Sequence, residues 1–322
     1  MTLLVIPDDY QKATDGLDFL HAHSGFTVRA LGDLSRDPAA DELLSEAQGL
    51  ILIRERTRID RHFLQKTPRL KLISQTSKAA RHIDMQACTD AGVAVVEGFG
   101  SAVAPAELTW LLIMAARRQL VAAVNAMKQG LWQVNIGEAL AGQTLGILGF
   151  GNIGKRMAHF AQAFDMKPLI WGTARAQQEA RSLGLRVAEN REAFFAEADI
   201  ITVHQRLVAE NTGNITLADL SLMKSSALFV NTSRAELVAP DALEQALRQG
   251  RPGFAALDVF MHEPVYDKNA PLLQMPNVLC TPHLGYVEKA GYELYFKTAF
   301  ENAVRFFQGD TSGVLNPEAL KK

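Results

Sequence analysis

The chain has 322 residues, of which 48% are hydrophobic and 21% are charged, and its formal net charge is −2. This length suits two domains, and the composition is that of an ordinary globular protein. A nearly neutral chain has no field that would hold a polyphosphate, so we expect no nucleic-acid partner.

The cysteine content, the first residues and the length of the apolar stretches argue against several further classes of protein. Two cysteines, Cys88 and Cys280, are too few for a disulfide framework or a metal cage, so we expect no metal. The first residues, MTLLVIPDDY, lack the basic start of a signal peptide. The longest apolar stretch, Leu108 to Ala116, is about half of what a bilayer span needs. These features predict a cytoplasmic location and no membrane partner.

Short apolar runs alternate with helical patterns through the first hundred residues. The runs LLVIP, FTVRAL, GLILIR, LKLISQ and VAVVEG predict five buried parallel strands at 3–7, 26–31, 49–54, 70–75 and 93–98. Between them, residues 8–23 and 38–48 are predicted as helices. This block has no glycine-rich phosphate loop.

A long apolar helix is predicted from about Pro105 to Lys128, and Gly130 ends it. Its first half lacks a polar face, so it should be buried between layers or domains. Six further strand candidates follow, at 144–150, 167–172, 199–204, 227–233, 253–260 and 277–283. A last helix at 287–308 would return the chain to the first block. The pattern predicts an α/β protein with two doubly wound parallel-sheet domains: a flavodoxin-like substrate domain at 1–102 and 288–322, and a Rossmann nucleotide-binding domain at 103–287.

A glycine turn, GFGNIG from Gly149 to Gly154, stands between a predicted strand and a helix. Gly149 would permit the tight turn, Gly151 would let the backbone approach a pyrophosphate, and Gly154 would allow close helix–strand packing. The helix start would offer N–H groups and a partial positive charge to phosphates. Because strand, turn and helix follow in the required order, we interpret this turn as a dinucleotide site, with a purely structural turn as the alternative.

The position expected to recognise the adenosine ribose carries no carboxylate. In this fold an acidic residue about 20 positions after the glycines accepts hydrogen bonds from the ribose. Here the second strand ends in Gly172, and Thr173 and Arg175 follow. A hydroxyl and a cation would suit a 2′-phosphate, whereas a solvated Arg175 would carry no such preference. The cofactor is therefore expected to be NAD or NADP.

Arg234, Glu263 and His283 each follow an apolar strand candidate of the second block. A 2-oxo acid places a carboxylate beside a reducible carbonyl, and Arg234 would clamp that carboxylate. His283 would supply the proton that the reduced oxygen needs, since histidine titrates near neutral pH. Glu263 would fix the ring through its other nitrogen. Each residue alone has an ordinary structural explanation, but their joint placement predicts hydride transfer to a small 2-oxo acid such as glyoxylate, hydroxypyruvate or a phosphorylated relative.

The motifs GFGNIG, NTSRAELV, ALDVFMHEP and TPHLGY resemble those of the D-isomer-specific 2-hydroxyacid dehydrogenase family, and the resemblance runs from about Leu50 to residues 315–317. It implies that Arg234 binds substrate, that Glu263 partners His283, and that His283 is the acid/base. The implied cofactor contacts are Asn152, Ile153, Thr232, Gly285 and Asp258, the last facing the nicotinamide carboxamide. It also implies an active site in the cleft between the domains and a homodimer built on the nucleotide-binding domain. His204 is interpreted as a loop contact to the cofactor rather than as a second acid.

The chain departs from that family in its substrate loop. The family usually carries a G-x-G there, whose backbone N–H groups grip the substrate carboxylate, but this chain reads Ser77-Lys78-Ala79. Arg54 matches a position near the substrate in phosphoglycerate-type members. Arg54, Lys78 and Ala79 are therefore predicted substrate contacts. The two cations indicate a second anionic group on the substrate, unless each is simply solvated.

Three other functions remain as alternatives. A relative acting on formate or phosphite is disfavoured, because formate oxidation needs no proton transfer to a substrate oxygen and would not require the Glu–His pair. A dinucleotide-sensing binding protein, like the family's corepressor branch, would keep the three residues and use an exposed apolar groove. A catalytically weak family member is indicated by the altered loop at 77–79.

Overall fold

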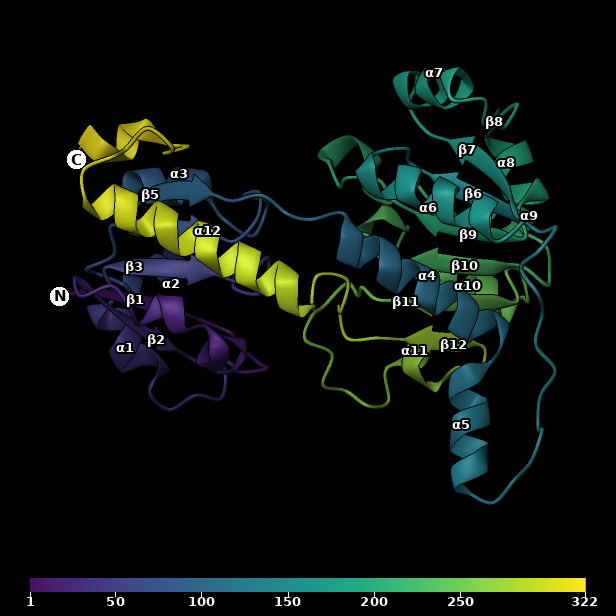
Figure 1. The fold of residues 1–322 in the computed structure, drawn as a ribbon, viewed down its shortest axis with the longest axis horizontal. Helices are drawn as coiled ribbons and strands as arrows, with labels where there is room; N and C mark the ends of the chain where they lie inside the picture. Colours follow the sequence, from purple (N-terminus) through teal and green to yellow (C-terminus); the bar gives the residue numbers. More distant parts are fainter. Residues whose placement is uncertain (322) are drawn as a thin grey trace. The chain divides into compact units, whose positions relative to one another are not determined.

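The computed structural model describes residues 1–321, which form two compact units (Figure 1). Unit 1 comprises Met1–Ser101 and the segment that begins at Glu288, and unit 2 comprises Ala102–Val287. Each unit holds one fully parallel sheet with helices on both faces, which confirms the predicted class of two doubly wound α/β domains. No helix within residues 1–321 has the length and apolar character that crossing a membrane requires.

Unit 1 is built on five strands in the order β2-β1-β3-β4-β5. The strands are β1 (Thr2–Ile6), β2 (Phe26–Ala30), β3 (Gly49–Leu52), β4 (Leu72–Gln75) and β5 (Ala94–Glu97). One face carries α1 (Ala40–Glu46), α2 (Arg61–Gln65) and α3 (Met85–Asp90), and the other carries α12 (Lys289–Phe307). Three 3₁₀ turns, η1 (Ala13–Gly16), η2 (Asp18–Leu20) and η5 (Pro317–Lys321), complete the unit. All five strand predictions are confirmed, and the order reverses between β1 and β3, as in flavodoxin-like sheets.

The helix predicted over residues 8–23 is wrong, because this segment forms only η1 and η2. The carboxylate of Asp9 accepts hydrogen bonds from the amides of Ala13 and Thr14 at 2.9 and 3.0 Å, and from the Thr14 hydroxyl at 2.8 Å. Lys12 has a positive φ of 53°. A side chain that bonds to nearby amides offers the backbone an alternative to the helix, and here that alternative prevails.

Unit 2 has seven strands in the order β12-β11-β10-β9-β6-β7-β8. They are β6 (Thr144–Leu148), β7 (Lys167–Trp171), β8 (Arg186–Val187), β9 (Ile200–Val203), β10 (Leu228–Asn231), β11 (Phe254–Leu257) and β12 (Val278–Cys280). The helices are α4 (Val103–Arg117), α5 (Leu120–Lys128), α6 (Asn152–Ala163), α7 (Ala174–Ser182), α8 (Arg191–Glu197), α9 (Leu217–Leu222), α10 (Ala242–Arg248) and α11 (Pro271–Gln274), with 3₁₀ turns η3 (Ala209–Asn211) and η4 (Ala235–Leu237). Six strands were predicted, and the short β8 was missed. The order reverses between β6 and β9, which is the Rossmann arrangement.

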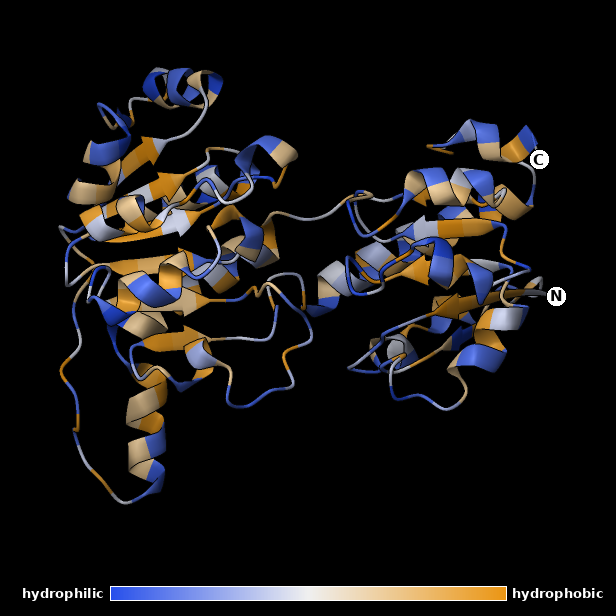
Figure 2. Cartoon of the chain, turned by 180° about the vertical axis from the view of Figure 1, so that it is seen from behind, coloured by the Kyte–Doolittle hydropathy of each residue, from blue (hydrophilic) through white to orange (hydrophobic). Residues whose placement is uncertain are grey.

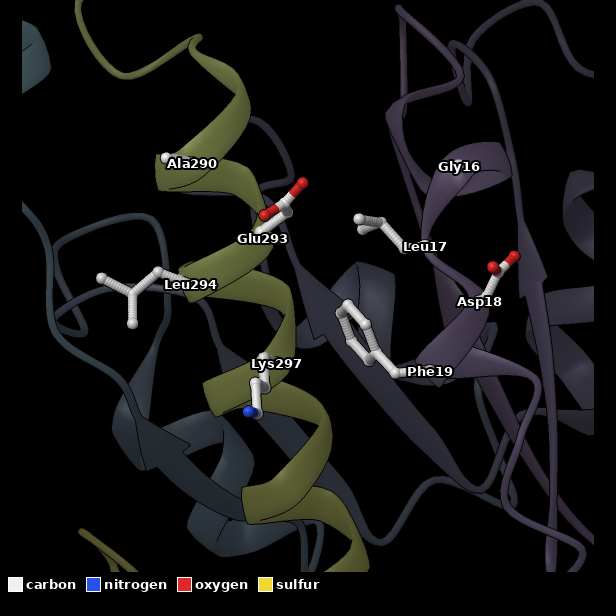
Figure 3. A pocket seen from close by; sticks show the side chains of 8 residues that line it. All are labelled: Gly16, Leu17, Asp18, Phe19, Ala290, Glu293, Leu294 and Lys297. Atoms are coloured by element: carbon white, nitrogen blue, oxygen red, sulfur yellow. The ribbon is translucent and has the colours of Figure 1, made fainter.

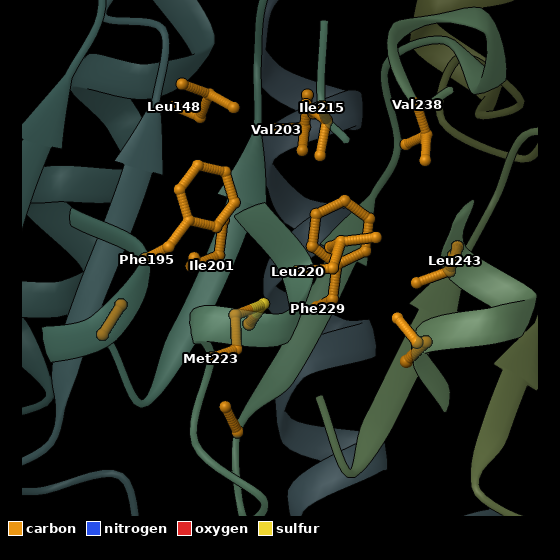
Figure 4. Close-up of a cluster of buried hydrophobic side chains, with 14 of the residues drawn as sticks. Leu148, Phe195, Ile201, Val203, Ile215, Leu220, Met223, Phe229, Val238 and Leu243 are labelled. Atoms are coloured by element: carbon orange, nitrogen blue, oxygen red, sulfur yellow. The ribbon is translucent and has the colours of Figure 1, made fainter. Parts of the chain in front are cut away.

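Two apolar cores hold the layers of unit 2 together. Figure 4 shows the core in which Phe195 of α8, Leu220 of α9 and Leu243 of α10 pack against one face of the sheet. On the other face, Trp110 of α4 and Met157 of α6 contribute to the second core. The strands are apolar and the helices carry polar residues as well (Figure 2), as expected of sheets buried on both faces.

The long helix predicted from Pro105 to Lys128 is divided into α4 and α5 at Gln119, whose φ is 47°. The side chain of the buried Arg117 fixes the end of α4 by donating to the carbonyls of Ser226 and Asp199 at 2.8 and 2.6 Å. By contrast, none of the nine residues of α5 is buried, and this helix extends away from the sheet of unit 2 (Figure 1). Eight of the fifteen residues of α4 are buried but Leu111 is 57% exposed, so burial of the apolar half is confirmed only in part.

Candidate functional site

The strands of unit 2 that precede the predicted site residues end level with one another. The register pairs Leu148 with Trp171 and Val203, Asn231 with Val203 and Leu257, and Leu257 with Cys280. The residues that directly follow these strand ends are Gly149, Gly172, His204, Thr232, Asp258 and Thr281. They therefore form a row along the carboxyl edge of the sheet, where open parallel sheets bind their ligands.

The three glycines of the turn at 149–154 differ in whether the surrounding protein leaves room for a side chain. A Cβ on Gly149, whose φ is 99°, would lie 2.8 Å from the His204 carbonyl oxygen. A Cβ on Gly154 would lie 2.3 Å from the Gly149 carbonyl oxygen, so close packing excludes side chains at both positions. At Gly151 a Cβ would meet no atom within 4 Å. Protein packing therefore does not require Gly151, whereas a ligand approaching the backbone would.

Helix α6 begins at Asn152, directly after Gly151, which lacks a side chain that could cap the helix. The N–H groups of its first turn, including those of Asn152 and Ile153, have no partner within the helix. A helix start of this kind favours phosphate, because of its N–H groups and its partial positive charge. Together with the open space at Gly151, these features fit the pyrophosphate of a dinucleotide.

The end of β7 lies beside the glycine turn. The Gly149 amide donates to the Trp171 carbonyl at 2.8 Å, and a Cβ on Gly172 would lie 3.7 Å from the Gly149 Cα. The Thr173 hydroxyl accepts from the Ala176 amide at 3.3 Å and so caps α7. Arg175, in the first turn of α7, is exposed. Arg175, and no carboxylate, thus follows the end of β7.

His204 is partly buried, and its backbone carbonyl lies against the glycine turn. Burial lowers the pKa of His204 to about 3, so its imidazole is neutral throughout the physiological range. Its Nε2 atom is buried and has no hydrogen-bond partner among the described residues. A neutral ring is a poor proton donor at pH 7, and a contact between His204 and the cofactor remains a prediction.

Asn231 shapes the loop that carries Arg234. Its amide side chain donates to the Arg234 carbonyl at 2.9 Å and accepts from the Ser233 amide at 3.0 Å. The Thr232 hydroxyl lies 2.6 Å from that of Thr109 in α4. Arg234 itself is half-buried, and one guanidinium nitrogen donates to the Ser233 carbonyl at 2.6 Å. The loop is thus held in place before any ligand binds.

The fully buried Asp258 binds the loop that follows β12. One of its oxygens accepts from the Thr281 hydroxyl at 2.6 Å and the Leu284 amide at 2.7 Å, and the other accepts from the Gly285 amide at 2.8 Å. Burial raises the pKa of the Asp258 carboxyl, although these hydrogen bonds partly oppose the rise. Asp258 therefore positions the turn of His283, in addition to any contact with a cofactor.

His283 and Glu263 are in direct contact. His283 Nδ1 lies 2.6 Å from Glu263 Oε2, and Glu263 Oε1 accepts from the Phe260 amide at 2.8 Å. The His283 ring also packs edge-on against Tyr286, with 5.3 Å between the ring centroids. His283 has a positive φ of 52°, which is uncommon outside glycine and is often found at functional sites. The contact with Glu263 thus engages Nδ1 of the ring and not Nε2.

The predicted substrate residues of unit 1 follow β3 and β4. Arg54 has a φ of 53°, and its amide donates to the Thr76 hydroxyl at 3.0 Å. Lys78 is exposed and forms an ion pair with Glu97, whose other oxygen accepts from the Ala79 amide at 2.9 Å. Glu97 was not among the predicted site residues, although it is the one charged residue of β5 and stands at its carboxyl end.

A shallow pocket of unit 1 contains none of the predicted site residues (Figure 3). It lies between the η1–η2 segment and α12, and it is lined by Gly16, Leu17, Asp18, Phe19, Ala290, Glu293, Leu294 and Lys297. Leu17 and Phe19 point toward α12, so the surface is partly apolar. Nothing in its chemistry connects it with the site on unit 2.

The known proteins that this chain resembles indicate one family. A family model described as "D-isomer specific 2-hydroxyacid dehydrogenase, NAD binding domain" matches residues 110–285. A glyoxylate reductase of Aeropyrum pernix is 35% identical over 305 residues, covering 90% of each chain. A D-3-phosphoglycerate dehydrogenase of Methanocaldococcus jannaschii is 34% identical over 250 residues, which are 76% of this chain but 47% of that longer protein.

Solved structures agree with these relatives. A putative D-3-phosphoglycerate dehydrogenase from Ralstonia solanacearum has a TM-score of 0.95 at 44% identity, covering 99% of this chain and 98% of that one. A phosphoglycerate oxidoreductase from Vibrio cholerae has a TM-score of 0.91 at 46% identity, covering 96% and 100%. The resemblance seen in the motifs is thereby confirmed, and the chain belongs to the D-isomer specific 2-hydroxyacid dehydrogenase family.

Proposed function

We propose that this protein transfers a hydride between NAD(P)(H) and a small 2-oxo or 2-hydroxy acid of the D configuration. The observation that carries the proposal is the 2.6 Å contact between His283 Nδ1 and Glu263 Oε2, at the sheet edge that also holds the glycine turn. In this proposal unit 2 binds the dinucleotide, and unit 1 contributes substrate contacts through Arg54, Lys78 and Ala79.

His283 is the proposed acid/base. Reduction of the carbonyl adds a hydride to carbon and leaves an oxygen that must gain one proton, and the protonated imidazole would deliver it from Nε2. The carboxylate of Glu263, bound to Nδ1, would orient the ring and stabilise its charged form. In the oxidation direction the neutral ring would accept the hydroxyl proton.

Arg234 is the proposed anchor of the substrate carboxylate. Its guanidinium follows β10, which is the neighbour of β11 in the sheet, and its loop is fixed by Asn231. A guanidinium matches a carboxylate through two parallel hydrogen bonds, which would fix the orientation of the carbonyl as well as the affinity.

The residues that would hold the cofactor are those of the row described above. The turn from Gly149 to Gly154 with Asn152 and Ile153 would receive the pyrophosphate, and Thr173 and Arg175 would stand at the ribose. His204, Thr232, Asp258 and Gly285 would line the nicotinamide end. When bound, the nicotinamide supplies the hydride.

The direct test is a steady-state assay of glyoxylate, pyruvate and hydroxypyruvate with NADH and with NADPH. We expect consumption of at least one reduced cofactor that depends on the 2-oxo acid, and formation of the D-hydroxy acid product by chiral chromatography. Tight NADH binding with no turnover of any acid would contradict the proposal and favour a dinucleotide-sensing protein.

We also propose that the protein is a homodimer that associates through unit 2. Residues 120–136, here called the arm, expose an unusual number of large apolar side chains. They are Leu120, Val121, Val124, Met127, Leu131, Trp132, Val134 and Ile136, each 45% or more exposed. Exposed large apolar side chains in such number are typical of a protein–protein interface, and isologous dimers are the commonest oligomers.

A further inference from the structure

Two cations of unit 1, Arg54 and Lys78, stand at the sheet edge where a parallel sheet binds its ligand. The register pairs Leu52 with Gln75 and Gln75 with Glu97, so the loops after β3, β4 and β5 begin level with one another. Two cations at such an edge would ordinarily indicate a site for a doubly charged ligand. Their partners in the structure argue otherwise.

Lys78 is engaged by the carboxylate of Glu97. One oxygen of Glu97 contacts the Lys78 ammonium, and the other accepts from the Ala79 amide at 2.9 Å. The Glu97 side chain is 21% exposed, whereas that of Lys78 is 67% exposed. The carboxylate is thus the more buried partner, and it already accepts from two donors of the loop, the Lys78 ammonium and the Ala79 amide.

Arg54 also has a carboxylate beside it. Its Nε lies 3.7 Å from Glu55 Oε2, and the two side chains are 19% and 22% exposed. Because both groups are largely removed from water, their charges are less screened than those of a surface pair. The backbone of Arg54 is fixed by Thr76 and by Gln75, whose side-chain amide donates to the Arg54 carbonyl at 2.9 Å.

We infer that Glu97, with Glu55, makes the enzyme selective for 2-oxo acids whose only charge is the carboxylate beside the carbonyl. This inference rests on the proposed function. Each resident carboxylate offsets the cation that would attract a second anionic group, and each would repel a phosphate or a second carboxylate placed nearby. Glu97 is therefore a specificity-determining residue, acting through charge at the loop rather than through the reacting atoms.

The test compares hydroxypyruvate with its 3-phosphate, because these two acids differ only in the second anionic group. We expect wild-type kcat/KM to be at least about tenfold higher for hydroxypyruvate. The Ralstonia and Vibrio proteins are named for phosphoglycerate, which would predict a preference for the phosphorylated acid. The two acids therefore distinguish our inference from that opposite preference.

Variants that remove the charge of Glu97, of Lys78 or of both form a double-mutant cycle. Glu97→Gln keeps an acceptor for the Ala79 amide but leaves Lys78 unbalanced, and we expect the ratio of kcat/KM for the phosphorylated over the plain acid to rise about tenfold. Lys78→Met leaves Glu97 unbalanced and should lower the ratio. The double variant restores neutrality and should return the ratio toward the wild-type value. If the Glu97–Lys78 pair only held the loop in place, the variants would instead reduce kcat/KM for both acids alike.

Glu46→Gln is the matched control, because Glu46 forms an ion pair with Arg69 on the surface of the same unit. Glu46 precedes β3 and Arg69 precedes β4, so this pair lies at the amino edge of the sheet, opposite to Glu97. It should leave the ratio unchanged. A wild-type enzyme that prefers the phosphorylated acid, or variants that shift both acids equally, would overturn the inference and leave the proposed function standing. Turnover of neither acid nor of glyoxylate would overturn both.

Discussion

His283 and Arg54 share an uncommon backbone conformation, with φ of 52° and 53°. For residues with a Cβ this conformation costs roughly 1 kcal/mol or more, and it persists where neighbours enforce it. Asp258 enforces it at His283 by accepting from the next two amides, and Thr76 and Gln75 enforce it at Arg54. Both candidate site residues are thus held in place by the fold before a ligand arrives.

Removal of the His283 imidazole tests its role as acid/base. His283→Ala should lower kcat for 2-oxo acid reduction by about 10²- to 10⁴-fold, because the proton would then have to come from water. Glu263→Gln keeps the size of the side chain and should cost less, about 10- to 100-fold. Stopped-flow turnover alongside NADH titration separates catalysis from binding, and near-full turnover by His283→Ala would refute the assignment.

The glycine turn offers a matched pair of substitutions. Gly151→Ala adds a Cβ that meets no protein atom, so the free energy of unfolding should stay within about 0.5 kcal/mol while the Kd of NADH rises at least tenfold. Gly154→Ala drives a Cβ against the Gly149 carbonyl and should lower the free energy of unfolding by about 1–3 kcal/mol. Urea unfolding and fluorescence titration measure both quantities. Unchanged NADH affinity in Gly151→Ala would argue against the dinucleotide site.

Replacement of the exposed Arg175 tests the choice between the two cofactors. If its guanidinium binds a 2′-phosphate, Arg175→Ala should weaken NADPH binding about tenfold or more while changing NADH binding little. Calorimetric titration of both cofactors checks this directly. Equal effects on the two Kd values would show that the exposed Arg175 is only solvated.

Between elements, a charged group joins α8 to α9. Arg191 donates to both oxygens of Asp219 at 2.7 and 2.9 Å, and Asp219 also accepts from the Thr216 amide and hydroxyl, each at 2.8 Å. Burial alone would raise the pKa of Asp219, but the Arg191 and Thr216 hydrogen bonds outweigh it and the pKa is lowered. The charged carboxylate therefore stabilises the folded state.

Asp219→Asn should lower the free energy of unfolding at pH 7 by about 1–3 kcal/mol. Because the folded pKa is lowered, this contribution is present above the ordinary aspartate value of about 3.9 and is lost as the pH falls toward the folded value. Urea unfolding at pH 7, 5 and 3.5 should show the difference from wild type shrinking at the lowest pH. Asp41→Asn, which removes an exposed pair with Lys66, should change stability by less than about 0.5 kcal/mol at every pH.

The strands were more predictable from the sequence than the helices, for a physical reason. A strand buried on both faces must be an apolar run, and eleven of the twelve strands read that way, whereas β8 has two residues and only one of them is apolar. Helix limits depended on side-chain contacts that no periodicity records, such as those of Asp9 and Arg117. Likewise the order along the chain predicted the row at the sheet edge. It also showed a charge at the end of β5, but not the contact of Glu97 with the Ala79 amide, because that contact joins the end of β5 to a separate loop.

At the scale of the whole molecule, the arm at 120–136 exposes large apolar side chains that unit 2 does not cover. It leaves Met127 and Trp132 65% and 75% exposed, respectively. Apolar area costs free energy in water, and a second copy that covered it would recover roughly 25 cal/mol for each Å² buried. Charges placed there would have to be desolvated on association, and unpaired buried charges are strongly unfavourable.

The double variant Met127→Asp, Trp132→Asp should therefore convert a wild-type dimer into a monomer in sedimentation velocity experiments. NADH affinity should change little, since neither residue belongs to the glycine turn or to the row of strand ends. Leu183→Asp alters an exposed leucine outside the arm, 59% exposed, and should leave the dimer intact. A monomeric wild type, or a double variant that still sediments as a dimer, would show that the arm serves some purpose other than self-association.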